Sequence, residues 1–337
     1  MNHEIDLEKY TVHTDLAIDY VENKEFNEVN LYDDIKVTNT VLTEKLAREI
    51  NKKPGRYITI QFEDVTDYSN KEKVKKVFTN ELKKIVEINS ESRVLIVGLG
   101  NNKSTPDALG PLVIDNILIT NHLFEYSNVE DGFIRTFGIK PGVFAATGIE
   151  TSDFIKGIVK EINPDLIIAI DALASGSVER LNKTIQITDT GISPGGGIGN
   201  KRKEISYEEF GVKVIAIGVP TVVDAVTIVS DTINYMYKHY SYNKLNIKNP
   251  KNKLISALNN NYLKENIEVE ESDKKSLLGI IGNFKEEELR ELIFEVLTPI
   301  GYNLMVTPKE IDFIIEILSD IISSGINNAL HENVDNL

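Results

Sequence analysis

Two short apolar runs, each leading to the same tripeptide, constrain the fold of this chain most strongly. Residues 94–100 are followed by a short loop and Asp107-Ala108-Leu109, and residues 166–170 lead directly into Asp171-Ala172-Leu173. Apolar runs of this length are typical of buried parallel strands. Because ligands bind beyond the carboxyl ends of parallel strands, we expect Asp107 and Asp171 to lie together at one edge of a sheet.

Two carboxylates at one edge of a sheet can form a catalytic pair. A shared site moves their pKa values apart, so that one carboxyl group can act as an acid and the other as a base. The alternative is structural, with each aspartate capping the helix that follows it. The spacing alone leaves both interpretations open.

Strands and helices alternate along most of the chain. The apolar pattern predicts strands at residues 57–62, 93–98, 165–170, 184–188 and 213–217. It predicts helices at residues 70–89, 107–123, 151–162 and 224–239, with a short helix possible in the charged arm of residues 1–30. This alternation predicts an α/β protein with three layers (α/β/α) and a mostly parallel central sheet.

The last third of the chain has a different pattern. Residues 240–253 are rich in Asn and Lys and predict a linker, and the pattern beyond them is helical. Thr307-Pro308-Lys309-Glu310 has the form of a capping box with proline at the first helical position, which predicts a helix starting there. We therefore expect an α/β domain up to residue 250 and a helical region at residues 251–337, packed on the same body.

The composition narrows the chemistry. The formal net charge of -15 argues against a broad nucleic-acid or anionic-membrane surface. No apolar stretch approaches the roughly 20 residues that span a bilayer, and the polar N-terminus lacks the pattern of a secretory signal. With no cysteine and 5 histidines, thiol chemistry, a Ser-His-Asp triad and a histidine-rich metal site are poorly supplied. We expect a soluble intracellular protein that uses carboxylates, amides, backbone dipoles and lysine.

Two glycine-containing loops are candidates for binding. Residues 97–101, which end at Asn101, follow a predicted strand, but Lys103 stands where a dinucleotide-binding loop has its third glycine. A tight turn explains that loop equally well. Residues 193–203 include Gly199 and end in Lys201-Arg202-Lys203, which is unusual in an acidic protein. This loop is either a solvated surface loop or an anion-binding flap beside the site, and it lacks the order of a nucleotide phosphate loop.

Taken together, these segments resemble the germination proteases of spore-forming bacteria over residues 5–240. The resemblance is carried by residues 97–101 with 105–111, 148–153, 169–174, 199–204 and 218–226. It implies a phosphorylase/hydrolase-like fold related to hydrogenase-maturation endopeptidases, and an atypical aspartic endopeptidase whose catalytic pair is Asp107 and Asp171. Those relatives use a histidine among their metal-contacting groups. The corresponding motifs here have none, so we expect neither a metal nor a cofactor.

The resemblance also implies how such an enzyme is made and used. Its substrates would be the small acid-soluble spore proteins of the spore core or forespore, cut after an acidic residue during germination. It would be a homotetramer, formed as a zymogen that cuts itself. Thr14-Asp15-Leu16-Ala17 looks like the family's cleavage sequence, which predicts a propeptide of residues 1–15 that ends at the Asp15–Leu16 bond.

Acidic specificity calls for a cation near the cleaved bond. We expect Lys201, Arg202 and Lys203 to provide it, with Gly199 and Asn101 close to the substrate backbone and with Arg135 and Arg180 as weaker candidates. Three other functions stay open at this point: a hydrogenase-maturation-like processing endopeptidase, a peptidyl-tRNA or ester hydrolase, and an α/β interaction module without activity.

Overall fold

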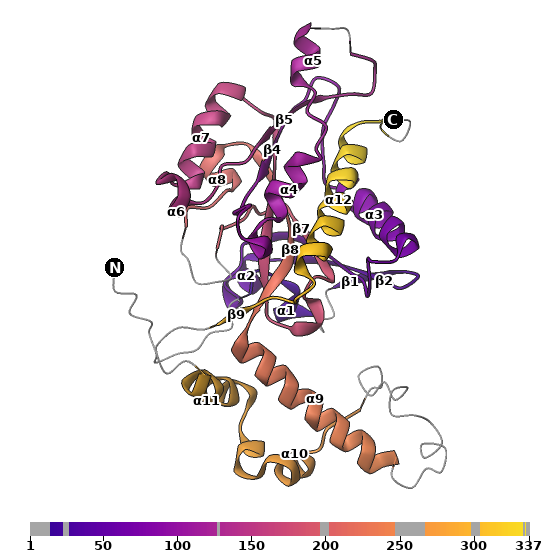
Figure 1. The fold of residues 1–337 in the computed structure, drawn as a ribbon, viewed down its shortest axis with the longest axis vertical. Coiled ribbons are helices and arrows are strands. Elements are labelled where there is room, and N and C mark those ends of the chain that lie inside the picture. Colours follow the sequence, from indigo (N-terminus) through magenta and orange to yellow (C-terminus); the bar gives the residue numbers. More distant parts are fainter. Residues whose placement is uncertain are drawn as a thin grey trace. The chain divides into compact units, whose positions relative to one another are not determined.

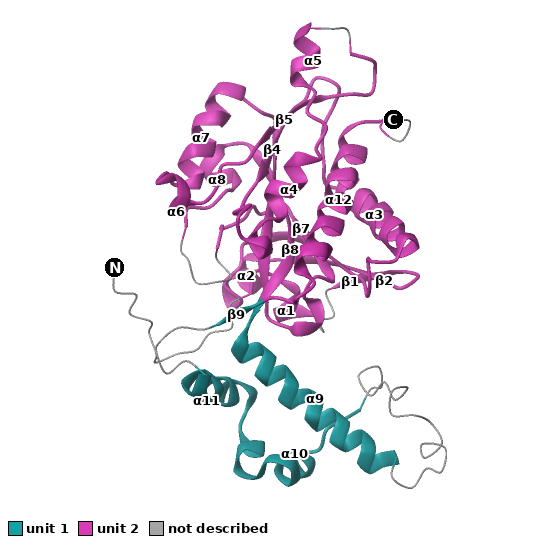
Figure 2. Ribbon diagram, in the orientation of Figure 1, with its two compact units in different colours: residues 1–12, 223–306 teal, residues 13–222, 307–337 magenta. Residues whose placement is uncertain are grey.

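A computed structural model describes residues 14–22, 27–126, 129–195, 202–246, 267–297, 304–332 and 334 of the chain. The chain forms two compact units, one of residues 13–222 and 307–337 and the other of residues 1–12 and 223–306 (Figure 2). The domain boundary expected after residue 250 lies outside the described residues. The larger unit contains both aspartates and all the contacts discussed for the site.

One mixed sheet runs through the larger unit, in the strand order β1-β2-β3-β7-β8-β6-β4-β5 over the described residues (Figure 1). The strands are β1 (Glu28–Tyr32), β2 (Ile35–Leu42), β3 (Gly55–Gln61), β4 (Arg93–Gly98), β5 (Arg135–Ile139), β6 (Leu166–Ser175), β7 (Thr184–Thr188) and β8 (Lys213–Asp224). The strands predicted from the apolar pattern all lie in this sheet. The two strands at the ends of this order, β1 and β5, and the strand β2 next to β1 were not predicted.

The α/β class is confirmed, but the sheet is less parallel than expected. Strand β4 pairs in parallel with β5 and β6, as the two apolar runs predict. The other half is antiparallel, because β1–β2, β2–β3, β3–β7 and β7–β8 all pair in that sense. The parallel part of the sheet therefore contains β4, which precedes Asp107, and β6, which contains Asp171. Antiparallel pairing extends the sheet from β8 to β1.

Helices cover both faces of the sheet, as a three-layer fold requires. On β4, Val94 and Ile96 join one buried cluster, and Leu95 and Val97 join another. The first cluster includes α3 (Tyr68–Lys83), α4 (Leu109–Asp115) and α12 (Ile311–Leu330), and the second includes α7 (Thr151–Ile162). This alternation of side chains along a strand that is buried on both faces is the basis of the three layers.

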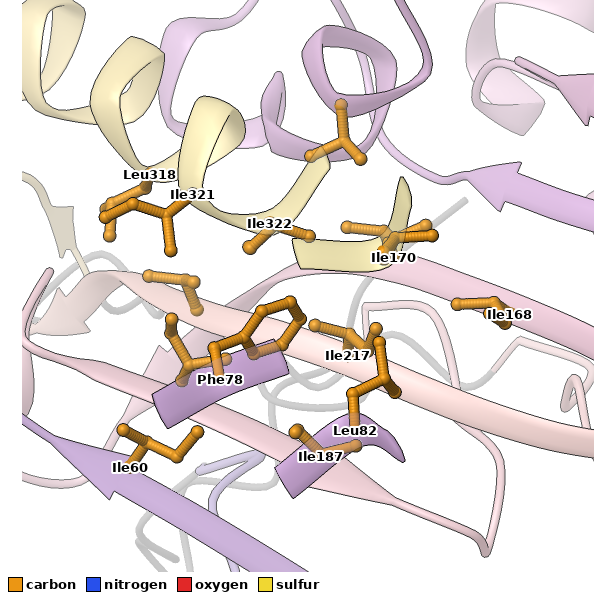
Figure 3. Close-up of a cluster of buried hydrophobic side chains, with 14 of the residues drawn as sticks. Ile60, Phe78, Leu82, Ile168, Ile170, Ile187, Ile217, Leu318, Ile321 and Ile322 are labelled. Carbon is orange, nitrogen blue, oxygen red and sulfur yellow. The ribbon is translucent and has the colours of Figure 1, made fainter. Parts of the chain in front are cut away.

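Helix α12 belongs to the core of the larger unit, whereas the described helices of residues 271–297 belong to the smaller unit. Leu318, Ile321 and Ile322 lie with Phe78 and Leu82 of α3 above the sheet (Figure 3). A Cβ atom at Gly325 would come within 2.3 Å of the Phe78 ring, so the glycine lets the two helices approach closely. Among the described helices, α12 alone is long and apolar enough to span a membrane, and half of the residues tested are buried inside the protein.

The capping box predicted for α12 does not form. The helix begins at Ile311 after Glu310, with no side-chain cap, and the Thr307 hydroxyl instead donates to the Thr221 carbonyl at 2.9 Å. The helix predicted at residues 107–123 is also divided, into α4 and α5 (Asn121–Tyr126), and it is preceded by the 3-10 turn η1 (Thr105–Asp107). Shorter helices in this unit are α1 (Ile18–Val21), α2 (Glu44–Glu49), α6 (Phe144–Thr147) and α8 (Tyr207–Phe210), with the 3-10 turn η2 (Val178–Arg180).

The smaller unit is mainly helical. It contains α9 (Ala225–Asn246), α10 (Glu271–Leu278), η6 (Gly279–Asn283), α11 (Glu286–Leu297) and the two-residue strand β9 (Met305–Val306), which pairs with the last two residues of β8. Helix α9 extends past the predicted end at residue 239, into the segment expected to be a linker. Val226 of α9 packs against Leu289, Ile293 and Phe294 of α11.

Candidate active site

Asp107 is held by a loop that folds back on itself after β4. The Asn101 N–H donates to the Asp107 carbonyl, and the Leu99 N–H donates to the Ile170 carbonyl of β6, both at 2.8 Å. Gly100 has a φ of 106°, and a Cβ atom there would lie 2.1 Å from the Asp107 carbonyl oxygen. Only glycine fits this close approach, so the glycine found in the sequence has a definite role in placing Asp107.

Asp171 lies within β6, which continues to Ser175, so the prediction that the strand ends at residue 170 was too short. The side chain is only 6% exposed, and the Ala172 N–H donates to its Oδ1 at 2.9 Å. Because the chain continues as a strand, Asp171 does not cap a helix, and that structural interpretation is wrong for this residue. Asp107 ends η1, two residues before α4, and is half-buried.

Burial affects the protonation of both carboxyl groups, and the charge of Asp107 also acts on Asp171. Burial raises the pKa of Asp107 to about 6, and the N–H group of Asn101 opposes this shift. Burial also raises the pKa of Asp171 well above its usual value, and the charges of Asp107 and Asp15 raise it further. The difference between the two pKa shifts follows from burial, because the more buried carboxyl group in a like-charged pair keeps its proton to higher pH. Ionisation of Asp107 therefore favours the protonated form of Asp171.

The arm of residues 14–22 lies along the end of β6. Strand β4 stops at Gly98, which pairs with Ile170, and Asp15 contacts the same strand further along. The Asp15 N–H donates to the Ala174 carbonyl at 3.0 Å, and the Ala174 N–H donates to the Asp15 carboxylate at 2.8 Å. Leu16 is fully buried against Leu173. The bond that the sequence marks as a cleavage site thus lies beside the strand that carries Asp171.

Two side chains that the sequence analysis did not single out also hold this arm. The Gln186 side chain of β7 accepts from the Ala17 N–H at 2.9 Å and donates to the Asp15 carbonyl at 3.3 Å. The Lys52 ammonium donates to the Thr14 carbonyl at 2.7 Å. Burial lowers the pKa of Lys52, and the charges of Asp15 and Asp19 oppose this shift. No local sequence pattern marks either residue, because each meets the arm across a long stretch of chain.

The next turn of the arm is fixed by Arg180, which the sequence analysis ranked as a weaker acid-binding candidate. Its guanidinium donates to Asp19 at 2.6 Å and pairs with Glu22. The Gly176 N–H also donates to Asp19, at 2.8 Å. Arg180 is therefore engaged with the arm's own carboxylates. Arg135 stacks on the Phe124 ring, at 4.6 Å from its centroid.

The predicted basic loop is only partly within the described residues. Gly199 and Lys201 lie outside them. Arg202 stacks on Phe144 at 4.7 Å from the ring centroid and lies 3.6 Å from Glu150, and Lys203 contacts Asp153 at 2.8 Å. Asn101 is in the loop that holds Asp107, where its side chain accepts from the Lys103 N–H at 3.1 Å. Each of the two described cations thus has an acidic partner near α7.

Comparisons with known proteins point to one group of enzymes. The sequence model of the family described as germination protease matches residues 2–337. The germination protease of Geobacillus sp. (strain WCH70) is 46% identical over an alignment 365 positions long, which covers 99% of this chain and 98% of that protein. The germination proteases of Bacillus cereus (strain G9842) and Priestia megaterium (strain ATCC 12872 / QMB1551) are 45% and 46% identical over the same shares.

Proposed function

Since the chain belongs to the germination protease family, we propose that it is the endopeptidase that begins the degradation of small acid-soluble spore proteins during germination. Membership of this family makes the chain a protease, and therefore a hydrolase. The substrates, the mechanism, the location in the spore core and a homotetrameric assembly are parts of the proposal. The observation that carries the mechanism is the pair of carboxyl groups with raised pKa values at β6 and the adjoining loop.

We propose that Asp107 is the base and Asp171 the acid. Ionised Asp107 would take a proton from a water molecule as the water oxygen bonds to the carbonyl carbon of the peptide. Protonated Asp171 would donate to the carbonyl oxygen, and a proton would then pass to the leaving amide nitrogen as the C–N bond breaks. Acid–base assistance of this kind contributes roughly 10²–10⁴-fold to a rate. The half-exposed position of Asp107 supports its role as the group that meets water.

We further propose that residues 1–15 are a propeptide, removed by cleavage of the Asp15–Leu16 bond. The docking of Asp15 and Leu16 on β6 supports this proposal, because it keeps a candidate substrate sequence beside the catalytic strand. The docked arm would also obstruct other substrates until it is cut. Mild acid is the proposed trigger, since protonation relieves repulsion among Asp15, Asp107 and Asp171.

The recognition of an acidic residue before the cut is assigned to the loop of Lys201, Arg202 and Lys203. To meet a substrate carboxylate, Arg202 would exchange its present partner Glu150 for the substrate. Arg202→Ala should then raise the KM for a peptide with Asp before the cut more than for its Asn analogue. An equal change in KM for both peptides would show that the loop does not read the charge.

Self-processing by the purified full chain tests the proposed function most directly. The intact mass of the wild type and of Asp107→Asn and Asp171→Asn would be followed over time at mildly acidic pH. We expect loss of residues 1–15 in the wild type only. Loss in both Asn variants at the wild-type rate would show that the cut does not depend on the aspartate pair. Circular dichroism of the variants controls for folding.

A further inference from the structure

Gln186 contacts the arm on both sides of the predicted cleavage site. Its side-chain amide donates to the carbonyl of Asp15, whose peptide bond to Leu16 would be cut, and accepts from the N–H of Ala17. The side chain lies on β7, opposite Thr59 of β3 and Gly218 of β8, and is only 6% exposed. A buried amide with both ends directed at the same short segment can fix the position of that segment closely.

The chemistry of the two arm groups sets the orientation of this amide. The Ala17 N–H can only donate, so it must face the carbonyl oxygen of Gln186. The amino end of the side chain is then directed at the Asp15 carbonyl, 3.3 Å away. That distance is long for an N–H···O bond, whose usual range is about 2.7–3.2 Å. A carbonyl oxygen that gains negative charge during attack by water would draw the donor closer and strengthen the bond.

Gln186 shares one face of the sheet with Asp171. Neighbouring residues Ile185 and Ile187 belong to the cluster beneath α3 and α12, so Gln186 points to the opposite face. On β6, Ile168 and Ile170 belong to that same cluster, which places Asp171 and Leu173 on the opposite face as well. Leu173 connects the two sites, because its side chain lies over Gly218, the β8 partner of Gln186, and it packs against Leu16.

The contacts of the arm suit a substrate strand as well as the chain's own arm. Gln186 and Lys52 bind main-chain groups of residues 14–17, and the Ala174 carbonyl accepts from the main-chain N–H of Asp15, whereas the Ala174 N–H binds the Asp15 carboxylate. Such pairing at an exposed strand edge is a common way to bind extended peptides, since it requires no particular side chain. Once residues 14 and 15 have left, the donor groups of Gln186, Lys52 and Ala174 that bound them are available to a second polypeptide.

We propose that Gln186 is a catalytic residue that donates a hydrogen bond to the carbonyl oxygen of the peptide bond being cut. Its carbonyl end holds the second residue after the cut and so fixes the register. This inference rests on the proposed endopeptidase function and adds an oxyanion donor to the two aspartates. Removal of one such donor typically lowers a rate by about 10²–10³-fold.

The test compares the first-order rate of self-processing in full-length wild type, Gln186→Met and Gln186→Glu, measured by intact mass. Methionine has a similar length but lacks both the donor and a strong acceptor, so we expect processing to slow by at least about 100-fold. Glutamic acid can replace both functions only when protonated. Its rate relative to the wild type should therefore rise as the pH is lowered while amide exchange at Asp15 and Leu16 stays unchanged, whereas a purely structural role would change the rate and the exchange together.

Gln61 provides the matched control, since it is a strand glutamine of the same sheet, on β3 opposite Thr184, with its Oε1 buried and unpaired. Gln61→Met should process at the wild-type rate. Amide hydrogen exchange at Asp15 and Leu16, whose N–H groups are bonded to Ala174 and Thr14 and not to Gln186, measures docking of the arm separately. Slow processing of Gln186→Met with a protected arm supports the proposal. Processing of Gln186→Met at the wild-type rate, or slow processing because the arm has undocked, overturns it. Failure of the wild type itself to process would instead contradict the proposed function.

Discussion

The loop that carries Asp107 and the strand that carries Asp171 hold similar carboxyl groups by different means. Asp171 lies inside β6, one residue past the last pairing with β4, and its position is set by the strand. Asp107 ends a three-residue turn and depends on the short bonds around Gly100 and Asn101. The difference teaches that a sheet can bury one carboxyl group and suppress its ionisation, whereas a loop can leave the other near water and able to ionise.

The position of Asp107 in its loop is easier to disturb by a substitution than the position of Asp171 in its strand. Gly100→Ala adds a Cβ atom 2.1 Å from the Asp107 carbonyl oxygen, at a φ that disfavours any side chain. We expect self-processing to slow by roughly 10–100-fold, because small displacements of a reacting group are costly. The loss of stability should be roughly 1–3 kcal/mol, from strain at a position that requires glycine. Intact mass and thermal unfolding measure the two effects.

Gly148→Ala separates strain from misplacement in this experiment. Gly148 also has a positive φ, 71°, but no atom lies within 4 Å of the Cβ position. It should therefore lose some stability and keep its processing rate. If Gly148→Ala slowed processing as much as Gly100→Ala, the loop would have no special part in placing Asp107.

The smaller effect concerns stability as a function of pH. Both carboxyl groups have pKa values raised by burial, so the unfolded chain releases these protons more readily than the folded protein. Stability is then lost as the pH rises from about 4 through the folded-state pKa values. Asp107→Asn and Asp171→Asn remove this penalty and should stabilise the protein near pH 7, Asp107→Asn by roughly 1–2 kcal/mol after allowance for its partial exposure.

Thermal unfolding at pH 4 and pH 7 measures this contrast between the two regions. We expect Asp171→Asn to gain more stability than Asp107→Asn at pH 7, because the strand buries its carboxyl group more completely. Both gains should shrink at pH 4, where the wild-type groups are protonated. A larger gain for Asp107→Asn would reverse the assignment of acid and base.

The parts of the fold that the sequence predicted are those with a strong local pattern. The apolar runs of β4 and β6 and the helix at Thr151–Ile162 could be read directly, because strands buried on both faces and amphipathic helices have distinct periods. Strand β1 could not be, since all of its residues are exposed and show no alternation. The capping box at Thr307 was misread because the hydroxyl group bonds to β8, a partner that is remote in the sequence.

The same distinction between local patterns and tertiary contacts applies to the residues of the candidate site. The two aspartates followed from their positions after apolar runs, and the arm's cleavage sequence followed from family resemblance. Gln186 and Lys52 were missed, because a strand glutamine and a lysine after a short helix have no local signature of binding. Their significance depends on tertiary contacts with residues 14–17, which only the folded chain brings together.

Because Arg180 pairs with Asp19 and Glu22, the two sides of the predicted cut would be held differently after cleavage. Breaking the Asp15–Leu16 bond would create an ammonium group on a segment that stays clamped to the body. The departing side would gain a second negative charge at Asp15. The first charge of Asp15 already raises the pKa of Asp171. Repulsion would then favour release of the side that ends at Asp15, while the side held by Arg180 would remain, so rejoining of the ends would be rare. The positions of the new charges would therefore make the maturation step effectively irreversible.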